Sequence, residues 1–333
     1  MKKIIAILLA VVFVVFAFAA CGTNTGNTDT SDASGENTTA APAGQKLRFA
    51  TGGESGTYYA FGSVLAQHAT NNIGTEITAI VGNGSQANVQ DLEDKAADLA
   101  FCQSDVMAYA YAGTNLFTAP VDCFSTVAAL YTEQVQIVTL DPEIKTVADL
   151  KGKNVSIGAA GSGVYFNAID ILGVYGLKEE DIKPTYQSFG DSADALKDGK
   201  IDAAFIVAGA PTTAVTDLST TKDVCLVSLD EEHINKLVEA SPYYAKCTIA
   251  KDVYGTAEDI LTVGVGAVIL ARNDVSEDVI YAFCADIFDN AEKLIDNHAK
   301  YGELSLEYAT SITSVPYHPG AVKYFAEKGI TVK

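Results

Sequence analysis

The 333-residue chain contains no tryptophan and only two arginines, and it carries a formal net charge of -20 at pH 7. Nucleic acids and anionic lipid surfaces are bound through clusters of positive side chains. The acidic chain has Arg48 and Arg272 as its two arginines, which argues against either of these partners. The same shortage means that an anionic solute would have to be held largely by backbone N–H groups at helix starts.

Cysteine is also sparse. Five cysteines follow Cys21, and no two of them form a CxxC pair, so a zinc ribbon or a redox motif is unsupported. Cys225 and Cys247 flank a predicted helix; they could form a disulfide in an oxidising compartment or remain buried free thiols. The four histidines show no ligand spacing, so we expect no metal site.

Sequence signatures of catalysis are missing as well. The chain has no GxSxG nucleophile elbow and no phosphate-binding P-loop, and the segment Gly161-Ser-Gly163 is too short to count as either. We therefore expect that the protein is not an enzyme and uses no cofactor.

The one long apolar run lies at the N-terminus. Lys2 and Lys3 precede an unbroken apolar stretch over residues 4–20, which ends in small residues before Cys21. This layout is typical of a secretory signal peptide. The junction resembles the lipobox of bacterial lipoproteins, so we expect residues 1–20 to be a signal peptide and Cys21 to carry a lipid. The alternative is a plain signal peptide followed by an ordinary cysteine.

Residues 22–45 contain no Leu, Ile, Val, Met or aromatic residue. A segment of this kind cannot bury enough apolar surface to offset the entropy of ordering it. Residues 21–45 are therefore predicted to be a disordered tether that holds a globular body, residues 46–333, outside the cytoplasm at the outer face of the cell membrane or in a periplasm.

Within the body, strand-like and helix-like stretches alternate. The expected strands are residues 46–51, 76–81 and 98–102, and the expected helices begin near Thr57, after Gly84 and near Gln103. A repeated strand–helix rhythm predicts a parallel sheet covered by helices, which is an α/β fold.

The body also repeats itself. Residues 50–59 and 157–166 both read as a strand end, a loop of small residues and Ser-Gly-x-Tyr before a helix, and residues 97–101 resemble residues 201–205. The matching positions are 107 residues apart for Ser55 and Ser162 and 104 apart for Leu92 and Leu196. Such a repeat predicts two similar lobes with a ligand cleft beyond their strand ends. We assign residues 46–135 plus 262–333 to lobe one and residues 136–261 to lobe two, with crossings in residues 129–140 and 260–270.

A set of short motifs, in this order, resembles one known family. The motifs are Thr51-Gly-Gly-Glu-Ser-Gly-Thr-Tyr-Tyr59, Phe101-Cys-Gln-Ser-Asp105, Asp149-Leu-Lys-Gly-Lys153, Gly161-Ser-Gly163, Asp202-Ala203 and Tyr317-His-Pro-Gly-Ala321. From residue 47 onward the chain resembles the TAXI-type solute receptors of TRAP (tripartite ATP-independent periplasmic) transporters. The resemblance implies a two-lobed clamshell like type II periplasmic binding proteins. It also implies a membrane permease as partner and a glutamate-like amino acid or C5 dicarboxylate as solute.

The candidate ligand-binding residues lie in the paired loops and at nearby helix starts. Free N–H groups at such starts favour an anion, and glycines let the backbone approach a ligand closely. The candidates are Gly53, Ser55, Gly56, Thr57, Tyr58, Ser85, Asn88, Gln103, Ser104, Gly161, Ser162, Gly163 and Tyr165. Ser85, Asn88 and Ser104 could instead be helix caps, and we interpret Asp105 as a plain N-cap. His318 is expected to fix a turn.

Two other functions fit the same body. One is an enzyme on the same two-lobed scaffold, since similar folds serve unrelated functions. The other is a sensor or adhesin lipoprotein without a role in transport.

Overall fold

The computed structural model describes residues 46–333. The predicted signal peptide, the lipidated Cys21 and the tether lie outside the described residues and stay predictions. Among residues 46–333, no helix is both long enough and apolar enough to cross a bilayer.

The strands of this body form one mixed sheet. Their order is β2-β1-β3-β10-β4-β7-β5-β6, with β8 beside β4 and β9 beside β10. The strands are β1 (Lys46–Ala50), β2 (Glu76–Ile80), β3 (Leu99–Gln103), β4 (Phe124–Thr139), β5 (Asn154–Ser156), β6 (Lys183–Thr185), β7 (Ala203–Ala208), β8 (Cys225–Leu226), β9 (Ala245–Ile249) and β10 (Ile260–Arg272). The three strands expected from the alternation of apolar and polar residues are β1, β2 and β3, and their bounds differ from the prediction by at most one residue.

Helices connect the strands and cover the sheet. They are α1 (Thr57–Asn72), α2 (Ser85–Glu93), α3 (Ser104–Ala112), α4 (Val164–Val174), α5 (Phe189–Lys197), α6 (Thr213–Ser219), α7 (Glu231–Ala240), α8 (Glu277–Asp289), α9 (Leu306–Ala309) and α10 (Pro319–Glu327). Helices α1 and α2 begin directly after their glycine-rich turns, and α3 begins at Ser104, next to the expected start at Gln103. His318 accepts a hydrogen bond from the Gly320 N–H at the start of α10, which confirms its structural role.

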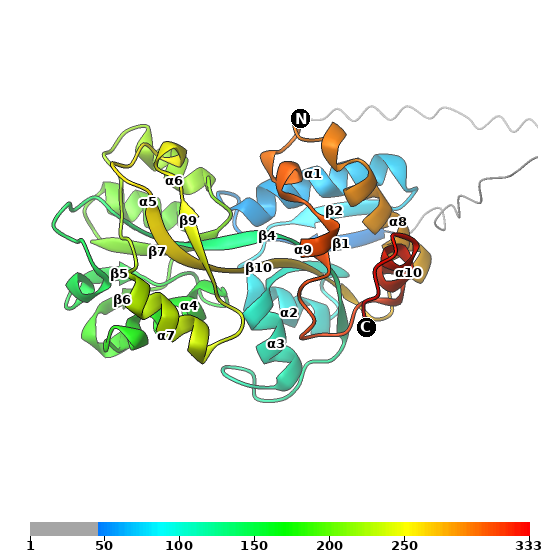
Figure 1. Ribbon diagram of the computed structural model, residues 1–333, viewed down its shortest axis with the longest axis horizontal. Coiled ribbons are helices and arrows are strands. Elements are labelled where there is room, and N and C mark those ends of the chain that lie inside the picture. The colour runs from blue at the N-terminus through cyan, green and yellow to red at the C-terminus, as the bar shows by residue number, and fades with distance from the viewer. Residues whose placement is uncertain (1–45) are drawn as a thin grey trace, which may run out of the picture. The chain divides into compact units, whose positions relative to one another are not determined.

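The sheet confirms the repeat. In the first lobe β1 lies between β2 and β3 in parallel, and in the second lobe β5 lies between β6 and β7 in parallel. Asp98, before β3, accepts a hydrogen bond from the Arg48 N–H of β1 at 2.8 Å. Asp202, before β7, accepts one from the Asn154 N–H of β5 at 2.7 Å. The two matching aspartates thus tie equivalent strands together in each lobe. Figure 1 shows these strands in the two halves of the sheet.

Two long antiparallel strands carry the chain between the lobes. Strand β4 pairs with β10 from Phe124 to Gln134 and then with β7 from Gln134 to Thr139. Strand β10 pairs with β9 at its start and with β3 near its end. In Figure 1 both strands run through the middle of the body, with β5, β6 and β7 at one side and β1 and β2 at the other.

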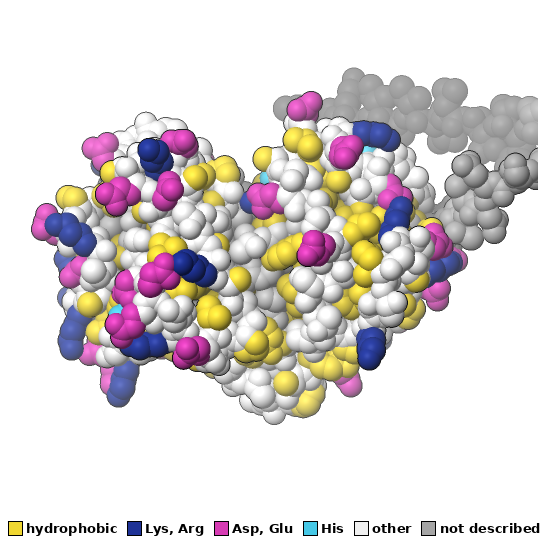
Figure 2. Space-filling view, in the orientation of Figure 1, with side chains coloured by type: hydrophobic (Ala, Val, Ile, Leu, Met, Phe, Trp, Pro, Cys, Tyr) yellow, Lys and Arg dark blue, Asp and Glu magenta, His cyan; other side chains and the backbone are white. Residues whose placement is uncertain are grey.

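Each lobe has its own apolar core. In the first lobe, α1, α8 and α10 pack on one face of the sheet around Phe49, Phe101 and Phe283. In the second lobe, α4 and α7 pack around Phe205 and Ile171. Most charged side chains lie on the outside, and acidic and basic groups are interspersed on the face shown in Figure 2. The C-terminal helices pack on the first lobe as expected.

Candidate functional site

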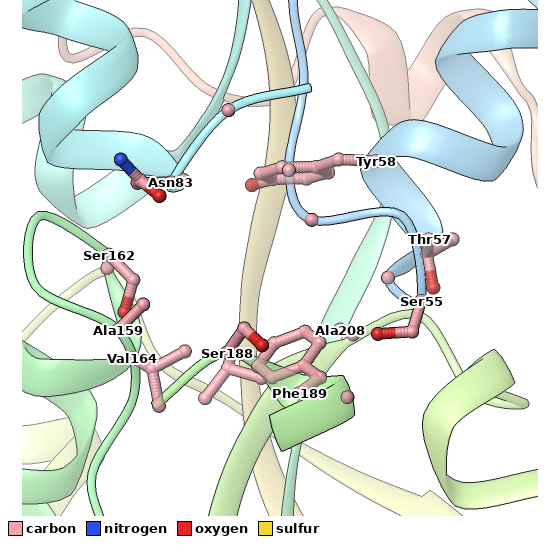
Figure 3. Close-up of a pocket in the computed structure, with 18 of the residues that line it drawn as sticks. Ser55, Thr57, Tyr58, Asn83, Ala159, Ser162, Val164, Ser188, Phe189 and Ala208 are labelled. Carbon is pink, nitrogen blue, oxygen red and sulfur yellow. The ribbon is translucent and has the colours of Figure 1, made fainter. Parts of the chain in front are cut away.

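A pocket of about 540 Å³ lies where the strand ends of the two lobes meet. Pockets of this size accommodate small molecules. Four turns between a strand and a helix form much of its wall: residues 52–58 and 81–85 from the first lobe, and 162–164 and 188–191 from the second. Figure 3 shows Tyr58 and Asn83 from the first lobe opposite Ser162 and Phe189 from the second. A solute in this pocket would therefore contact both lobes.

Four helix N-termini reach the pocket. The N-cap positions of α1, α2 and α4 are Gly56, Gly84 and Gly163, so no side chain there can cap the helix. The fourth helix, α5, is capped by Ser188, whose hydroxyl accepts a hydrogen bond from the Asp191 N–H. Unpaired N–H groups and the helix dipole attract negative charge, so the three glycine-capped starts can hold an anionic group.

Two of these glycines are required where they stand. Gly84 has a φ of 102°, a conformation that side chains with a Cβ disfavour. Gly163 has an ordinary φ of -69°, but a Cβ there would lie 1.6 Å from the Oε1 atom of Gln103, in the other lobe. At Gly163 the lobes approach so closely that only a hydrogen atom fits.

Hydrogen bonds join the lobes beside the pocket. The Gln103 amide donates to Asn167 Oδ1 at 2.6 Å, and the Asn167 amide donates to Asp105 Oδ2 at 2.9 Å. Nearby, the Ala87 N–H donates to the Gly161 carbonyl at 2.9 Å. The structure therefore shows the lobes in contact around the pocket.

Three buried side chains of the pocket lining carry polar atoms that have no hydrogen-bond partner within the described chain. Glu133 is 2% exposed, and its Oε1 atom accepts no hydrogen bond. The hydroxyl groups of Tyr58 and Ser162 are likewise buried and unpartnered. Burial raises the pKa of Glu133 to about 8. Buried polar groups are almost always hydrogen-bonded, so these atoms are positioned for a ligand.

The charged side chains of the lining are all acidic. Glu133 is buried, and Glu54, Asp191 and Asp194 are exposed. No lysine, arginine or histidine belongs to the lining formed by residues 46–333. An anionic part of a ligand would thus depend on the helix starts.

The structure brings nine of the predicted residues to this pocket. They are Gly53, Ser55, Gly56, Thr57, Tyr58, Ser85, Gln103, Ser162 and Gly163. Both paired loops contribute, which follows from the equivalent positions of β1–α1 and β5–α4 in the two lobes.

The other four predicted residues lie outside the lining. The Asn88 amide is buried and donates to the carbonyls of Thr51 and Phe101, so its role is to join α2 to β1 and β3. The Tyr165 hydroxyl points away to Glu179, at 2.9 Å. Gly161 contacts Ala87 across the lobes but does not reach the pocket.

Ser104 is the fourth, and its surroundings correct two sequence predictions. Its hydroxyl accepts a hydrogen bond from the Gly266 N–H of β10 and does not cap α3. Asp105 is not an N-cap either, because α3 begins at Ser104 with Gln103 in the cap position. Asp105 is instead fully buried against Asn167 of the other lobe, and burial raises its pKa to about 7.

Several lining residues escaped the sequence analysis: Glu133, Ser188, Phe189, Val207 and Ala208. The repeat contained a signal for most of them. A shift of 104 residues takes Ser85 to Phe189 and Gln103 to Val207, so the second lobe's counterparts of known candidates were available. Glu133 has no counterpart of this kind, because it belongs to a strand that crosses between the lobes.

The cysteines of the described chain are all free thiols. Cys225 and Cys247, which could have formed a disulfide, lie on β8 and β9 and are half-buried. The pocket contains no cysteine.

Comparisons with known proteins agree with this architecture. A model of the NMT1-like family matches residues 49–329. Among solved structures, a protein of Bordetella bronchiseptica RB50 is 18% identical with a TM-score of 0.52, covering 84% of this chain and 88% of that one. The ligand-binding component of an ABC-type import system from Staphylococcus aureus, solved with zinc bound, is 11% identical with a TM-score of 0.51, covering 87% and 94%.

A third solved structure is an alkanesulfonate-binding protein from Xanthomonas axonopodis pv. citri bound to MOPS, with 16% identity, a TM-score of 0.47 and coverage of 86% and 85%. At these identities the likeness concerns the fold. The predicted fold class is confirmed: the body has the two-lobed α/β fold of type II periplasmic binding proteins.

Proposed function

The chain belongs to the NMT1-like family, and on that premise we propose that it is an extracytoplasmic solute-binding receptor. It captures a small polar or anionic solute, either a glutamate-like amino acid or a C5 dicarboxylate. It then delivers this solute to the membrane subunit of a TRAP transporter. The observation that carries the proposal is the pocket whose wall is formed by helix starts from both lobes.

Binding and closure are coupled in this proposal. A ligand shifts a two-state equilibrium only by its difference in affinity for the two states. A solute that contacts the turn at Ser55–Thr57 and the turn at Ser162–Val164 gains contacts only when the lobes are together. The lobes move about β4 and β10, and the closed form is what the permease recognises.

The motif set that resembles TAXI-type receptors supports the choice of a TRAP permease over other transporters. The same proposal includes a lipid on Cys21, a tether over residues 21–45 and a location at the outer face of the cell membrane or in a periplasm. Lobe one then comprises residues 46–135 and 262–333, and lobe two residues 136–261.

A thermal-shift screen of the purified protein tests the receptor function. The panel contains amino acids, dicarboxylates, keto acids and sugars. A solute at 100 times its Kd stabilises the folded state by about 2.7 kcal/mol, which raises Tm by several degrees. A solute-specific shift without chemical change of the solute, followed by mass spectrometry, supports a receptor, whereas turnover supports an enzyme. Uptake into vesicles that contain the permease, with and without the receptor, tests delivery.

A further inference from the structure

Glu133 is the one acidic side chain of the pocket lining that is buried. It lies on β4 opposite Val265 of β10, where β4 passes from one lobe to the other. Its Oε1 atom has no hydrogen-bond partner, and the hydroxyl of Tyr58, also in the lining, has none. The Tyr131 hydroxyl and the Gly209 N–H act on the same carboxyl group and lower its pKa. A buried carboxyl oxygen without a hydrogen-bond partner is costly, so a ligand that supplies a donor to Oε1 is favoured here.

Lys300 is the cation whose charge acts on Glu133, but its ammonium group is paired with other residues. Lys300 lowers the pKa of Glu133 through its charge, but it forms an ion pair with Glu303 and donates a hydrogen bond to the Ala210 carbonyl at 3.1 Å. Asp105 acts on Glu133 in the opposite direction, as a like charge. No ion pair between Lys300 and Glu133 occurs in the described structure.

The chemistry that completes this site is a protonated amine. An ammonium group has three N–H donors and a positive charge. The Glu133 Oε1 atom offers an acidic acceptor and the Tyr58 hydroxyl a neutral one, and neither atom makes a hydrogen bond within the described chain. The polar neighbours that act on them are Tyr131 and Gly209 beside Glu133, and Ser85 beside Tyr58. The helix starts of α1 and α4, with glycine at the N-cap, present N–H groups that attract the negative charge of a ligand. The pocket thus presents a site for each end of a zwitterion.

We propose that Glu133 binds the protonated amine of the solute, with the Tyr58 hydroxyl as a second acceptor. The solute's carboxylate then meets the helix starts of α1 and α4. This inference rests on the proposed receptor function and narrows its solute to an amino acid. A C5 dicarboxylate that lacks an amine supplies neither the ammonium donors nor the positive charge that stabilises the Glu133 carboxylate.

A proton accompanies this binding. Because burial raises the pKa of Glu133 to about 8, the side chain is mostly a neutral carboxylic acid at pH 7 when no cation is beside it. An ammonium group stabilises the carboxylate, so the carboxyl proton leaves to the buffer while the amine keeps its own. Affinity should therefore rise about tenfold per pH unit from pH 6 toward pH 8 and level off above it.

The test is isothermal titration calorimetry on the whole protein with matched solutes. L-Glutamate and L-glutamine carry the amine, and glutarate and 2-oxoglutarate do not. The variant Glu133→Gln keeps the shape and removes the charge, and Glu239→Gln on the exposed surface of α7 is the control. An amino acid from the panel should bind at least about 30-fold more tightly than the amine-free acids, and Glu133→Gln should lose about 30-fold or more.

Proton release gives a second readout that needs no variant. Titration of the native protein at pH 7 in buffers of different ionisation enthalpy should show nearly one proton released per amino acid bound. Amine-free acids binding as tightly as amino acids, Glu133→Gln keeping its affinity within threefold, or no proton release would overturn the ammonium assignment and leave the receptor function intact. A folded protein that binds no solute of the full panel overturns both.

Discussion

Replacing Gly163 with alanine should weaken solute binding without harming either lobe. The backbone φ of -69° at this position suits any residue, so the substitution adds no backbone strain. A Cβ would, however, lie 1.6 Å from Gln103 Oε1 and 3.0 Å from Ser85 Oγ. Both of these atoms belong to the opposite lobe, so the collision exists only while the lobes are together.

The expected loss of binding free energy follows from the displacement of the Gln103 side chain. Gln103 has to turn away, which breaks the 2.6 Å hydrogen bond to Asn167 and leaves buried polar atoms unpaired, at a cost of about 1–3 kcal/mol. The extra methyl group in a packed interface costs about a further 1–3 kcal/mol. At 1.4 kcal/mol per factor of ten, a total of about 2 kcal/mol or more lowers affinity about 30-fold or more.

Calorimetric titration of Gly163→Ala with the solute found by screening measures this loss. The matched control is Gly173→Ala in α4 of the same lobe, where an added Cβ meets nothing within 4 Å. Its affinity should equal that of the native protein. If Gly163→Ala, folded by its thermal melt, binds within threefold of the native protein, the inference that closure at this contact drives binding is refuted.

Three further outcomes follow from buried groups. Asn88→Ala should lower the free energy of unfolding by about 2–4 kcal/mol in a urea melt, because two buried carbonyls lose their donor; a loss below about 0.5 kcal/mol contradicts the bridging role. Asp105, with its pKa raised to about 7, binds a proton more tightly in the folded than in the unfolded protein, so stability should fall as pH rises from about 4 to 7; thermal melts of Asp105→Asn should lack this part of the slope. Burial raises the pKa of the Cys284 thiol, so this cysteine should resist a disulfide reagent that modifies the half-buried Cys225, and equal rates in native protein would contradict it.

The strand–helix rhythm and the repeat were readable from the sequence because each depends on local patterns. Gly56 and Gly163 mark helix starts in both halves, and the sheet brings the two starts to one pocket. The direction in which each side chain points was harder to predict from the sequence. Ser85 and Asn88 share a face of α2, but Asn88 lies one turn deeper and reaches the strand carbonyls in place of the pocket. Tyr165, one residue after Val164, is rotated toward Glu179.

The place of Glu133 in the pocket could not be predicted from local sequence patterns. It lies in a strand of mostly buried residues, and no neighbouring motif marks it. Its position in the pocket depends on the register of β4 against β10 and β7, which brings together segments far apart in the chain. The same holds for Asp105, whose contact with Asn167 forms only because two lobes meet.

The place of Glu133 on β4 also bears on the order of events during capture. Points near an axis move least when two bodies rotate about it, and Glu133 lies where β4 exchanges its pairing with β10 for pairing with β7. The Gly163 turn belongs to the second lobe and precedes α4, which is not part of this strand crossing, so in the proposed closure it moves relative to the first lobe. In this proposal, a solute can contact Glu133 while the two lobes are apart and keep that contact during closure. The Gly163 turn reaches the solute later, when the lobes come together. Association would then depend on the contact with Glu133, and dissociation on the later contact at the Gly163 turn. Substitutions at Glu133 should therefore change mainly the association rate constant, and substitutions at Gly163 mainly the dissociation rate constant.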